Sequence, residues 1–402
     1  MKQICDRDLC SGCSACMNIC PHSAISMEES IGVGYIYPSI QSDKCVDCHL
    51  CVDVCPVIHP LALSEPKAAV AAVAKDFKEL TTSTSGGASA VLAKYILLQG
   101  GVVYGCVQRN YMDISHRRIH RMEDLNTLKG SKYVQSHIGL CYKQVKQDLK
   151  QNVPVLFTGT PCQIAGLRNY LHKEYSNLYL VDLVCHGVPS QKLLREDINH
   201  LFRKFGTPPT DLLVSFRRKR KNNLRFGTFI EHPQISEISP KEQKFPNDNY
   251  ITAFMSGIIF RKNCFSCPYA RPYRISDITL ADFWGYQGKQ LDISQGVSLM
   301  LPSTDKGVRL TNSIKQYIHW EKRPVSEAVQ GNGQLMAPSI EPAEREVFHS
   351  MYVTNPQEAY SVCLKAYRKE WRKKLLLQTA FFQWKPIRYL IILTARIRKL
   401  LK

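Results

Sequence analysis

Two cysteine runs near the N-terminus constrain this chain more than any other feature of its sequence. Each run has the spacing Cys-x2-Cys-x2-Cys-x3-Cys-Pro, and the second repeats the first. In runs of this kind three closely spaced thiolates bind one four-iron cluster, and the fourth, before proline, binds the other. Cluster I would therefore be held by Cys10, Cys13, Cys16 and Cys55. Cluster II would be held by Cys20, Cys45, Cys48 and Cys51.

Residues 1–60 are thus predicted to form a bacterial-type dicluster ferredoxin module, whose function is to move electrons. The alternative is a pair of zinc sites, because zinc also binds Cys-x2-Cys. Two complete runs that each end in Cys-Pro favour the iron–sulfur interpretation. Cys5 lies outside both runs and is expected to be a spare thiol, while His22 and His49 are expected at the surface rather than as ligands.

Charge is distributed unevenly along the chain. The formal net charge is +19, but residues 1–65 contain three basic and eight acidic side chains, which leaves that segment near −5 and the remainder near +24. A basic body suits anionic partners such as a phosphate-bearing cofactor, an acidic protein or a membrane surface. The asymmetry argues against a nucleic-acid-binding protein, which stays an alternative on charge alone.

Sixteen cysteines in a chain without a secretory leader indicate metal or redox ligands rather than disulfides. No apolar signal region opens the sequence, and no stretch approaches the roughly 18 uninterrupted apolar residues of a membrane span. We therefore expect a cytoplasmic protein in a reducing compartment.

A proline-punctuated stretch, residues 57–66, predicts a domain boundary, and the length of 402 residues also favours more than one domain. Strand-like and helical patterns then alternate, which predicts an α/β core. The expected strands are 68–74, 102–108, 153–159 and 178–185. The expected helices are 88–99, 138–150, 163–172 and 191–205. After about residue 207 the pattern becomes irregular and richer in strands, so we expect a mixed sheet.

Four further cysteines lie where such a sheet would gather its ligands. Thr160 is expected to cap a helix that starts at Pro161, which puts Cys162 in the first turn, where the helix dipole favours a thiolate. Cys185 follows a strand, and Cys264 and Cys267 form a Cys-x2-Cys-Pro pair. Four thiols are the number that a third four-iron cluster needs.

Three alternatives to that third cluster remain open. They are a structural zinc, scattered buried thiols, and a nucleophilic Cys162 with His186 as its base. Cys106, Cys141 and Cys363 have no cysteine neighbours in the sequence and are expected to be packed inside the fold.

Two segments are candidates for binding phosphate. A turn of small residues, Ser85-Gly86-Gly87, opens a helix whose amides could receive phosphate, although a plain N-cap explains it equally well. The second is residues 129–136, with two lysines and several hydrogen-bonding side chains, or else a solvated loop. A basic run with flanking aromatics, residues 216–226, could clamp an anion, although such a run is usually a solvated turn. Phe283 and Trp284, at the end of a strand, would suit a flat ring or the core.

In this order, these segments resemble the coenzyme F420 hydrogenase/dehydrogenase beta-subunit family. The matching pieces are SGG (85–87), KGSKYVQS (129–136), FTGTPCQIAGL (157–167), DLVCHGVPS (182–190), CFSCPYA (264–270) and DITLADFWG (277–285). With the fused ferredoxin module they cover residues 1 to about 290, and they look like the longer bacterial branch of the family.

The resemblance implies a domain that holds FAD beside a 4Fe–4S cluster and exchanges hydride with a deazaflavin or a related donor. It implies the same third-cluster ligands, Cys162, Cys185, Cys264 and Cys267. It also implies a set of residues near the flavin: Ser85, Gly86, Gly87, Lys129, Ser131, Lys132, Gln135 and Thr160.

The C-terminal segment, residues 341–402, is expected to be a basic amphipathic helical tail. Between residues 364 and 402 there are twelve basic side chains and one acidic, with apolar residues at roughly helical spacing. Such a helix is typical of membrane-surface or partner contact, and a terminal helix packed on the domain is the alternative. Pro386 is expected to divide it into two helices.

The predicted fold class is α+β: the ferredoxin module, a mixed α/β flavin-binding domain over residues 67–340, and the basic tail. The predicted function is an iron–sulfur flavoprotein oxidoreductase that connects a hydride carrier, through FAD and 4Fe–4S clusters, to a one-electron partner. A non-catalytic ferredoxin-type adaptor that docks a partner enzyme is the alternative. We expect a redox partner protein or small two-electron carrier, no nucleic acid, no proton-transferring catalytic residue, and a peripheral membrane contact only through the tail.

Overall fold

A computed structural model of the protein describes residues 3–203, 206–220, 223–231 and 243–383. Lys221 of the basic run and the expected division of the tail at Pro386 lie outside the described residues.

The ferredoxin module consists of two short helices and one antiparallel hairpin. Its elements are α1 (Ala15–Ile19), β1 (Ile25–Glu29), β2 (Ile36–Ile40) and α2 (Leu50–Asp53). The two cysteine runs fold alike, because α1 and α2 each follow a left-handed residue directly after the second cysteine, Ser14 (φ 65°) and His49 (φ 60°). Ile4, Ala24 and Ile25 pack against the cysteines themselves. The apolar core of this module is small, so the cysteines make up much of its interior.

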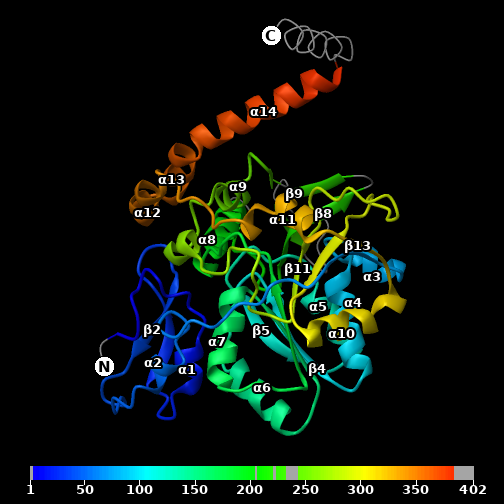
Figure 1. The fold of residues 1–402 in the computed structure, drawn as a ribbon. Helices are drawn as coiled ribbons and strands as arrows, with labels where there is room; N and C mark the ends of the chain where they lie inside the picture. The colour runs from blue at the N-terminus through cyan, green and yellow to red at the C-terminus, as the bar shows by residue number, and fades with distance from the viewer. Residues whose placement is uncertain (1–2, 204–205, 221–222, 232–242, 384–402) are drawn as a thin grey trace, which may run out of the picture.

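A mixed eight-stranded sheet forms the centre of the main domain (Figure 1). Its strand order is β13-β3-β12-β11-β7-β6-β4-β5. Its strands are β3 (Ala69–Ala74), β4 (Val102–Asn110), β5 (Asp113–Ile119), β6 (Val155–Gly159), β7 (Leu178–Leu183), β11 (Ile278–Asp282), β12 (Ser298–Pro302) and β13 (Ile318–Arg323). The four central strands from β4 to β11 are parallel, and the outer pairings are antiparallel. The expected mixed sheet is therefore confirmed, and the four expected strands are β3, β4, β6 and β7.

Helices cover both faces of this sheet (Figure 1). One face packs against α6 (Cys141–Lys150) and α7 (Pro161–Leu171). The other packs against α4 (Ala88–Leu98), α5 (Leu125–Leu128) and α10 (Asp305–Ser313). Alternation along each strand explains the two cores: in β6, Phe157 faces the first and Leu156 the second. The first core also includes Cys13, Ala15 and Val54, so the ferredoxin module is packed directly on α6 and α7.

A smaller sheet with its own helices completes the domain. It has the order β10-β9-β8, with β8 (Leu213–Arg220), β9 (Asn223–Glu231) and β10 (Gln243–Lys244). The remaining α-helices are α3 (Phe77–Thr82), α8 (Gln191–Phe202), α9 (Asn249–Ser256), α11 (Val325–Gly331), α12 (Arg345–Thr354), α13 (Pro356–Cys363) and α14 (Lys365–Gln383). The short 3-10 helices are 122–124, 262–266 (η2), 315–317 and 333–335. The described part of the basic run lies on β8 and at the start of β9, in strands rather than in the solvated turn that such runs usually form.

The C-terminal helices do not all form a separate tail. Phe348, Tyr352 and Tyr360 of α12 and α13 are buried in one core with residues of α8 and α9, so packing places the start of any tail at α14. Even α14 is anchored at its start, where Trp371 meets the ring of Phe245 at 4.9 Å. Its later turns lead away from the body (Figure 1). Within the described residues, no helix is both long and apolar enough to cross a membrane.

Candidate iron–sulfur and flavin site

The four predicted ligands of cluster I lie together. Burial raises the pKa of Cys16 well above its ordinary value, and the nearby Cys13, Cys10 and Cys55 raise it further. Cys55 comes from the second run, so the fold brings it across to the first three cysteines, as the Cys-Pro rule predicts.

Cys5 is not the spare thiol that the sequence indicated. Its thiol forms hydrogen bonds with Cys10 and Cys55, and these raise its own pKa. The bond with Cys5 is in each case the main reason that the pKa of Cys10 falls to about 6 and that of Cys55 to about 7. Cys5 therefore lies directly beside two of the predicted ligands of cluster I. Only its position five residues before Cys10 hinted at this.

The four predicted ligands of cluster II surround a small cavity. They are Cys20, Cys45, Cys48 and Cys51. Its other walls include the apolar side chains of Ala24, Ile25 and Ile40. Cys48 is exposed, whereas Cys20 and Cys51 are buried. This cavity therefore has an apolar inner side and one ligand at the protein surface.

The four cysteines of the predicted third cluster also converge. Cys162 is the second residue of α7, Cys185 follows β7, and Cys264 and Cys267 lie in and after η2. Burial raises the pKa of Cys185, and Cys264, Cys162 and Cys267 raise it further. Segments distant in the sequence thus bring these thiols into one group.

The N-terminus of α7 is built as predicted. Thr160 caps it in a reciprocal capping box with Gln163, and Pro161 is the first helical residue. The Thr160 hydroxyl also lies 3.2 Å from the Cys162 sulfur. Burial nevertheless raises the pKa of Cys162 and outweighs the expected effect of the helix dipole. A raised pKa disfavours the alternative in which Cys162 is a nucleophile.

Ligand spacing bears on the choice between iron–sulfur and zinc. Across the described part of the chain, no three Cys, His, Asp or Glu side chains approach closely enough to bind a single metal ion. Four ligands of one zinc ion crowd around it at about 2.3 Å from each sulfur. A four-iron cube binds each thiolate to a different iron and so separates them more widely. The thiolates of a four-iron site therefore lie farther apart than those of a zinc site.

Cluster I and the third cysteine group are adjacent. The charge of Cys162 affects the pKa of Cys13, and the Ser11 side chain of the ferredoxin module forms a hydrogen bond with Cys162. Tyr142 of α6 is buried and its hydroxyl lies 2.9 Å from the carbonyl of Cys13 and 2.7 Å from that of Gln163. These contacts fix the two cysteine groups side by side across the domain boundary.

The two predicted phosphate-binding segments meet, and Gly86 and Gly87 each have a structural role in the first of them. The hydroxyls of Thr84 and Ser131 are 3.3 Å apart, which joins the Ser85-Gly86-Gly87 turn to the 129–136 loop. A Cβ at Gly86 would lie 2.2 Å from the carbonyl oxygen of Ala72. Gly86 is therefore needed for close packing on β3, whereas Gly87 (φ +85°) starts α4.

The polar side chains of the 129–136 loop are engaged within the protein. Lys129 pairs with the buried Glu79 at 2.5 Å. Lys132 donates hydrogen bonds to three carbonyls of residues 127–129, and burial lowers its pKa. Gln135 is buried; its nitrogen donates to the Ser11 carbonyl at 3.0 Å and its oxygen accepts from Arg261 at 3.2 Å. These residues shape the loop, and Gln135 joins the two domains.

The basic strand β8 supplies groups that the sequence did not single out individually. Lys219 donates to the carbonyls of Leu80 and Ser85, at 2.8 and 2.6 Å, and so holds the Ser85-Gly86-Gly87 turn. Burial, reinforced by Arg217, lowers the pKa of Lys219 to about 8. Arg217 pairs with Asp282 at the end of β11 at 2.7 Å. Its side chain is buried, and its Nε atom has no hydrogen-bond partner.

That orphaned donor tests whether the region fits a flavin. A buried N–H without a partner is costly and is usually satisfied by a ligand or water. A flavin and its phosphates offer acceptors of the required kind.

His186, next to Cys185, has an exposed side chain, yet partial burial of its ring lowers its pKa. Of the aromatic pair, Phe283 is buried in the core and Trp284 is 46% exposed, so only Trp284 is available to a ring.

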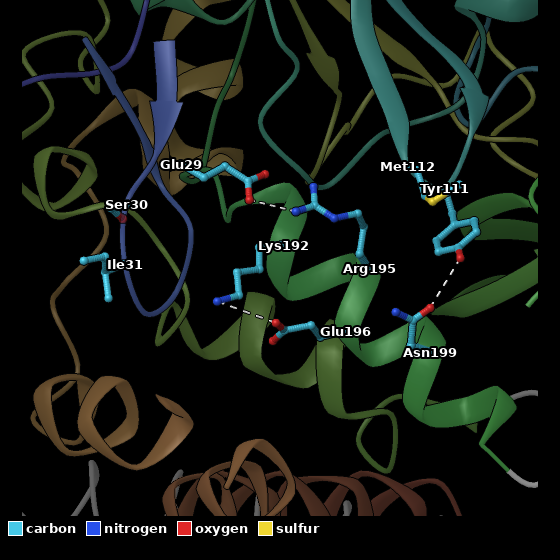
Figure 2. Close-up of a pocket in the computed structure, with 9 residues that line it drawn as sticks. All are labelled: Glu29, Ser30, Ile31, Tyr111, Met112, Lys192, Arg195, Glu196 and Asn199. Atoms are coloured by element: carbon cyan, nitrogen blue, oxygen red, sulfur yellow. Dashed lines mark hydrogen bonds and ion pairs between the residues drawn. The ribbon is translucent and has the colours of Figure 1, made fainter. Parts of the chain in front are cut away.

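A separate hollow lies between the turn of the β1–β2 hairpin, the β4–β5 turn and α8 (Figure 2). Its charged side chains are paired, Arg195 with Glu29 at 2.8 Å and Lys192 with Glu196 at 3.6 Å. None of the residues predicted for the clusters or the flavin lines it. It marks a junction between the ferredoxin module and the main domain.

Comparison with known families accounts for both parts of the chain. Residues 154–328 match the family described as the C terminus of the beta subunit of coenzyme F420 hydrogenase/dehydrogenase, and residues 9–58 match the 4Fe-4S dicluster domain. Residues 154–328 therefore form a domain of the F420 hydrogenase/dehydrogenase beta-subunit family, fused to a 4Fe-4S ferredoxin domain. With these two domains the chain is an iron–sulfur protein of electron transfer, of the oxidoreductase type. All four cysteines of the third group lie within the matched residues 154–328.

Among solved structures, one chain of the F420-reducing [NiFe] hydrogenase complex from Methanosarcina barkeri is similar to this chain. The identity is 16%, the match covers 74% of this chain and 91% of that chain, and the TM-score is 0.47. No curated protein matches at a significant level.

Proposed function

We propose that this protein passes electrons between a two-electron hydride carrier, coenzyme F420 or a related compound, and a one-electron partner protein, through FAD and three 4Fe–4S clusters. The observation that carries the proposal is the convergence of Cys162, Cys185, Cys264 and Cys267 directly beside Cys13 of the ferredoxin module. A third cluster at this position would link the family domain to the ferredoxin clusters in one chain.

Each part of the path has its own residues. Cys162, Cys185, Cys264 and Cys267 would hold the third cluster; cluster I and cluster II would follow in the ferredoxin module. FAD, when bound, converts the two-electron exchange of hydride into single-electron steps. The Ser85-Gly86-Gly87 turn, held by Lys219, and the 129–136 loop would bind it, with Thr160 and the free Nε of Arg217 nearby.

The exposed side of cluster II is the proposed exit for electrons. Cys48 is exposed, and next to it Val46 is 61% and Leu50 is 39% exposed. Asp43 and Asp53 are also exposed or half-exposed, in a segment whose net charge is negative. An apolar patch with acidic residues nearby suits a basic one-electron carrier protein.

The proposed role of the C-terminus is contact with a partner or with the inner membrane face. The described start of α14 is strongly basic, with Lys365, Lys369 and Lys373 among its residues. Its packing at Trp371, together with the 2.6 Å bond from Arg368 to Asn249, supports a docked helix for the first turns. Any lipid contact would then involve later residues.

Substitution of one third-cluster ligand tests the proposal. Cys185→Ser should lower iron from about twelve to about eight atoms per chain, with the ferredoxin signals retained in electron paramagnetic resonance. Cys363→Ser is the matched control, because Cys363 is buried without a cysteine neighbour, and it should keep all the iron. Equal iron in both variants would contradict the third cluster. A flavin-free holoprotein would instead favour a ferredoxin-type adaptor.

A further inference from the structure

Arg261 is the feature that the proposed path does not yet explain. Its side chain is completely buried, with 0% exposure. Other buried arginines have carboxylate partners: Arg274 pairs with Asp182 at 3.2 Å and Arg345 with Glu341 at 3.3 Å. Among the residues that the structure describes, Arg261 has no such partner. A buried cation without a counter-charge is strongly unfavourable, so a negative group should lie nearby.

The guanidinium of Arg261 spans the boundary between the two domains. It donates to the carbonyls of Cys10 and Ile36 in the ferredoxin module, both at 2.8 Å. It also donates to the Gln135 side chain of the main domain at 3.2 Å, and it lies over the Tyr37 ring at 4.5 Å. Neutral acceptors therefore satisfy its hydrogen bonds but leave its charge uncompensated.

Arg261 contacts both neighbouring cysteine groups, that of cluster I and the third group. Its guanidinium donates to the carbonyl of Cys10, so the positive charge lies at a predicted ligand of cluster I. The Arg261 backbone is also part of the third site, since its carbonyl accepts from the Cys264 amide at 3.0 Å. Within the described part of the chain, by contrast, the hydrogen bonds of the Arg261 side chain reach none of the four predicted ligands of cluster II.

We propose that Arg261 is a positive charge shared by cluster I and the third cluster, which raises the reduction potential of both and positions them for electron exchange. This inference rests on the proposed function, because it needs both clusters. A four-iron cube with four thiolates carries a net negative charge, and each reduction adds another. A cation between two such cubes stabilises their reduced forms and screens their mutual repulsion. Arg261 is therefore a positioning residue and does not itself exchange electrons.

The test is a redox titration, followed by electron paramagnetic resonance, of wild-type protein, Arg261→Gln and Arg261→Lys. Iron is counted first, and loss of the third-site signal in Cys185→Ser identifies that cluster. In Arg261→Gln the ratio of reduced to oxidised cluster at a fixed potential should fall about tenfold for cluster I and the third cluster. That is a shift of about 59 mV for a one-electron couple. Cluster II should not change, and Arg261→Lys, which keeps the charge, should stay close to wild type.

Arg118→Gln is the control, since Arg118 pairs with Asp148 and its side-chain hydrogen bonds reach no predicted cluster ligand, and it should leave all potentials unchanged. If Arg261→Gln does not retain its iron, Gln135→Glu places a carboxylate beside the intact arginine and should lower the same two potentials. Unchanged potentials in an iron-complete Arg261→Gln or Gln135→Glu protein would overturn the inference. So would an equal shift in Arg261→Lys. Too little iron in the wild type would instead overturn the proposed third cluster, so the two failures are distinguishable.

Discussion

Gly166 of α7 lies so close to Cys13 of the ferredoxin module that a Cβ atom at position 166 would stand 2.9 Å from the Cys13 sulfur. It would also stand 3.2 Å from the hydroxyl of Tyr142. Helix α7, which carries Cys162, therefore packs against the ferredoxin module at Gly166, where it has no side chain. This contact sets the distance between cluster I and the third cysteine group.

Gly166→Ala should push the ferredoxin module away from α7. The added methyl group meets a sulfur that would be fixed by iron, so the structure cannot adjust at that atom alone. We expect a loss of about 1–3 kcal/mol in the free energy of unfolding and slower electron exchange between the two clusters. Gly333→Ala is the control, because nothing lies within 4 Å of its added Cβ. Urea unfolding and stopped-flow reduction would measure both effects, and equal behaviour of the two variants would refute this contact.

Tyr142→Phe removes the hydroxyl that bridges the carbonyls of Cys13 and Gln163. We expect a loss of about 1 kcal/mol in the free energy of unfolding, since both carbonyls lose a buried donor. Tyr104→Phe removes a hydroxyl that is equally buried but bonded to Asp148, away from the cysteines. Only Tyr142→Phe should alter the third-cluster signal in electron paramagnetic resonance. An altered signal in Tyr104→Phe alone would contradict the account.

His116 predicts how stability depends on pH. Burial lowers its pKa to about 4, and the charge of Lys132 lowers it further, whereas the hydrogen bond with the Thr158 carbonyl at 2.9 Å opposes this shift. The unfolded chain binds this proton near pH 6.5, so stability is full above that pH and falls as pH drops toward 4. From pH 7.5 to 5.5 we expect a loss of about 1 kcal/mol from this residue.

Urea unfolding of wild-type protein and His116→Gln at both pH values measures that loss. His349, whose pKa burial also lowers to about 4, is present in both proteins and cancels in the comparison. The variant should be less stable at pH 7.5 but less sensitive to pH. An identical pH dependence in the two proteins would show that His116 does not cause it.

Lys219→Met should weaken flavin binding, because it frees the carbonyls of Leu80 and Ser85 and so loosens the Ser85-Gly86-Gly87 turn. We expect a several-fold higher dissociation constant by fluorescence titration. The pKa of Lys219 is about 8, lowered mainly by burial, so its charge is lost as pH rises through 8. Wild-type affinity should therefore decline between pH 7 and 9, while that of Lys219→Met stays flat. Lys322→Met, on the exposed strand β13, is the control and should bind flavin as wild type does.

Much of the fold could be predicted from short-range patterns. The cysteine spacing predicted a repeated unit in the ferredoxin module, and apolar runs such as 102–108 and 153–159 became β4 and β6. The burial of Arg217 on strand β8 could not be predicted. A register shift between Ser215 and Arg217 turns this charged side chain toward the interior. Sequence periodicity carries no signal for such a bulge.

The cysteines of the candidate site were also foreseen, because they occur in pairs or at strand ends. Arg261 was not, since its partners Cys10, Ile36 and Gln135 come together only when the two domains pack. Gln135 was predicted beside the flavin, and its bond to the Ser11 carbonyl, which joins the two domains, was not foreseen. Residues that act across a domain boundary have no local spacing by which they could be found.

The most direct test of the proposed electron path is metal and flavin analysis of the whole chain, purified without oxygen. The path predicts about twelve iron and twelve sulfide atoms, one FAD and no zinc per chain. About eight irons with one zinc would contradict it, because Cys162, Cys185, Cys264 and Cys267 would then hold a structural ion and the path from flavin to ferredoxin would have no link.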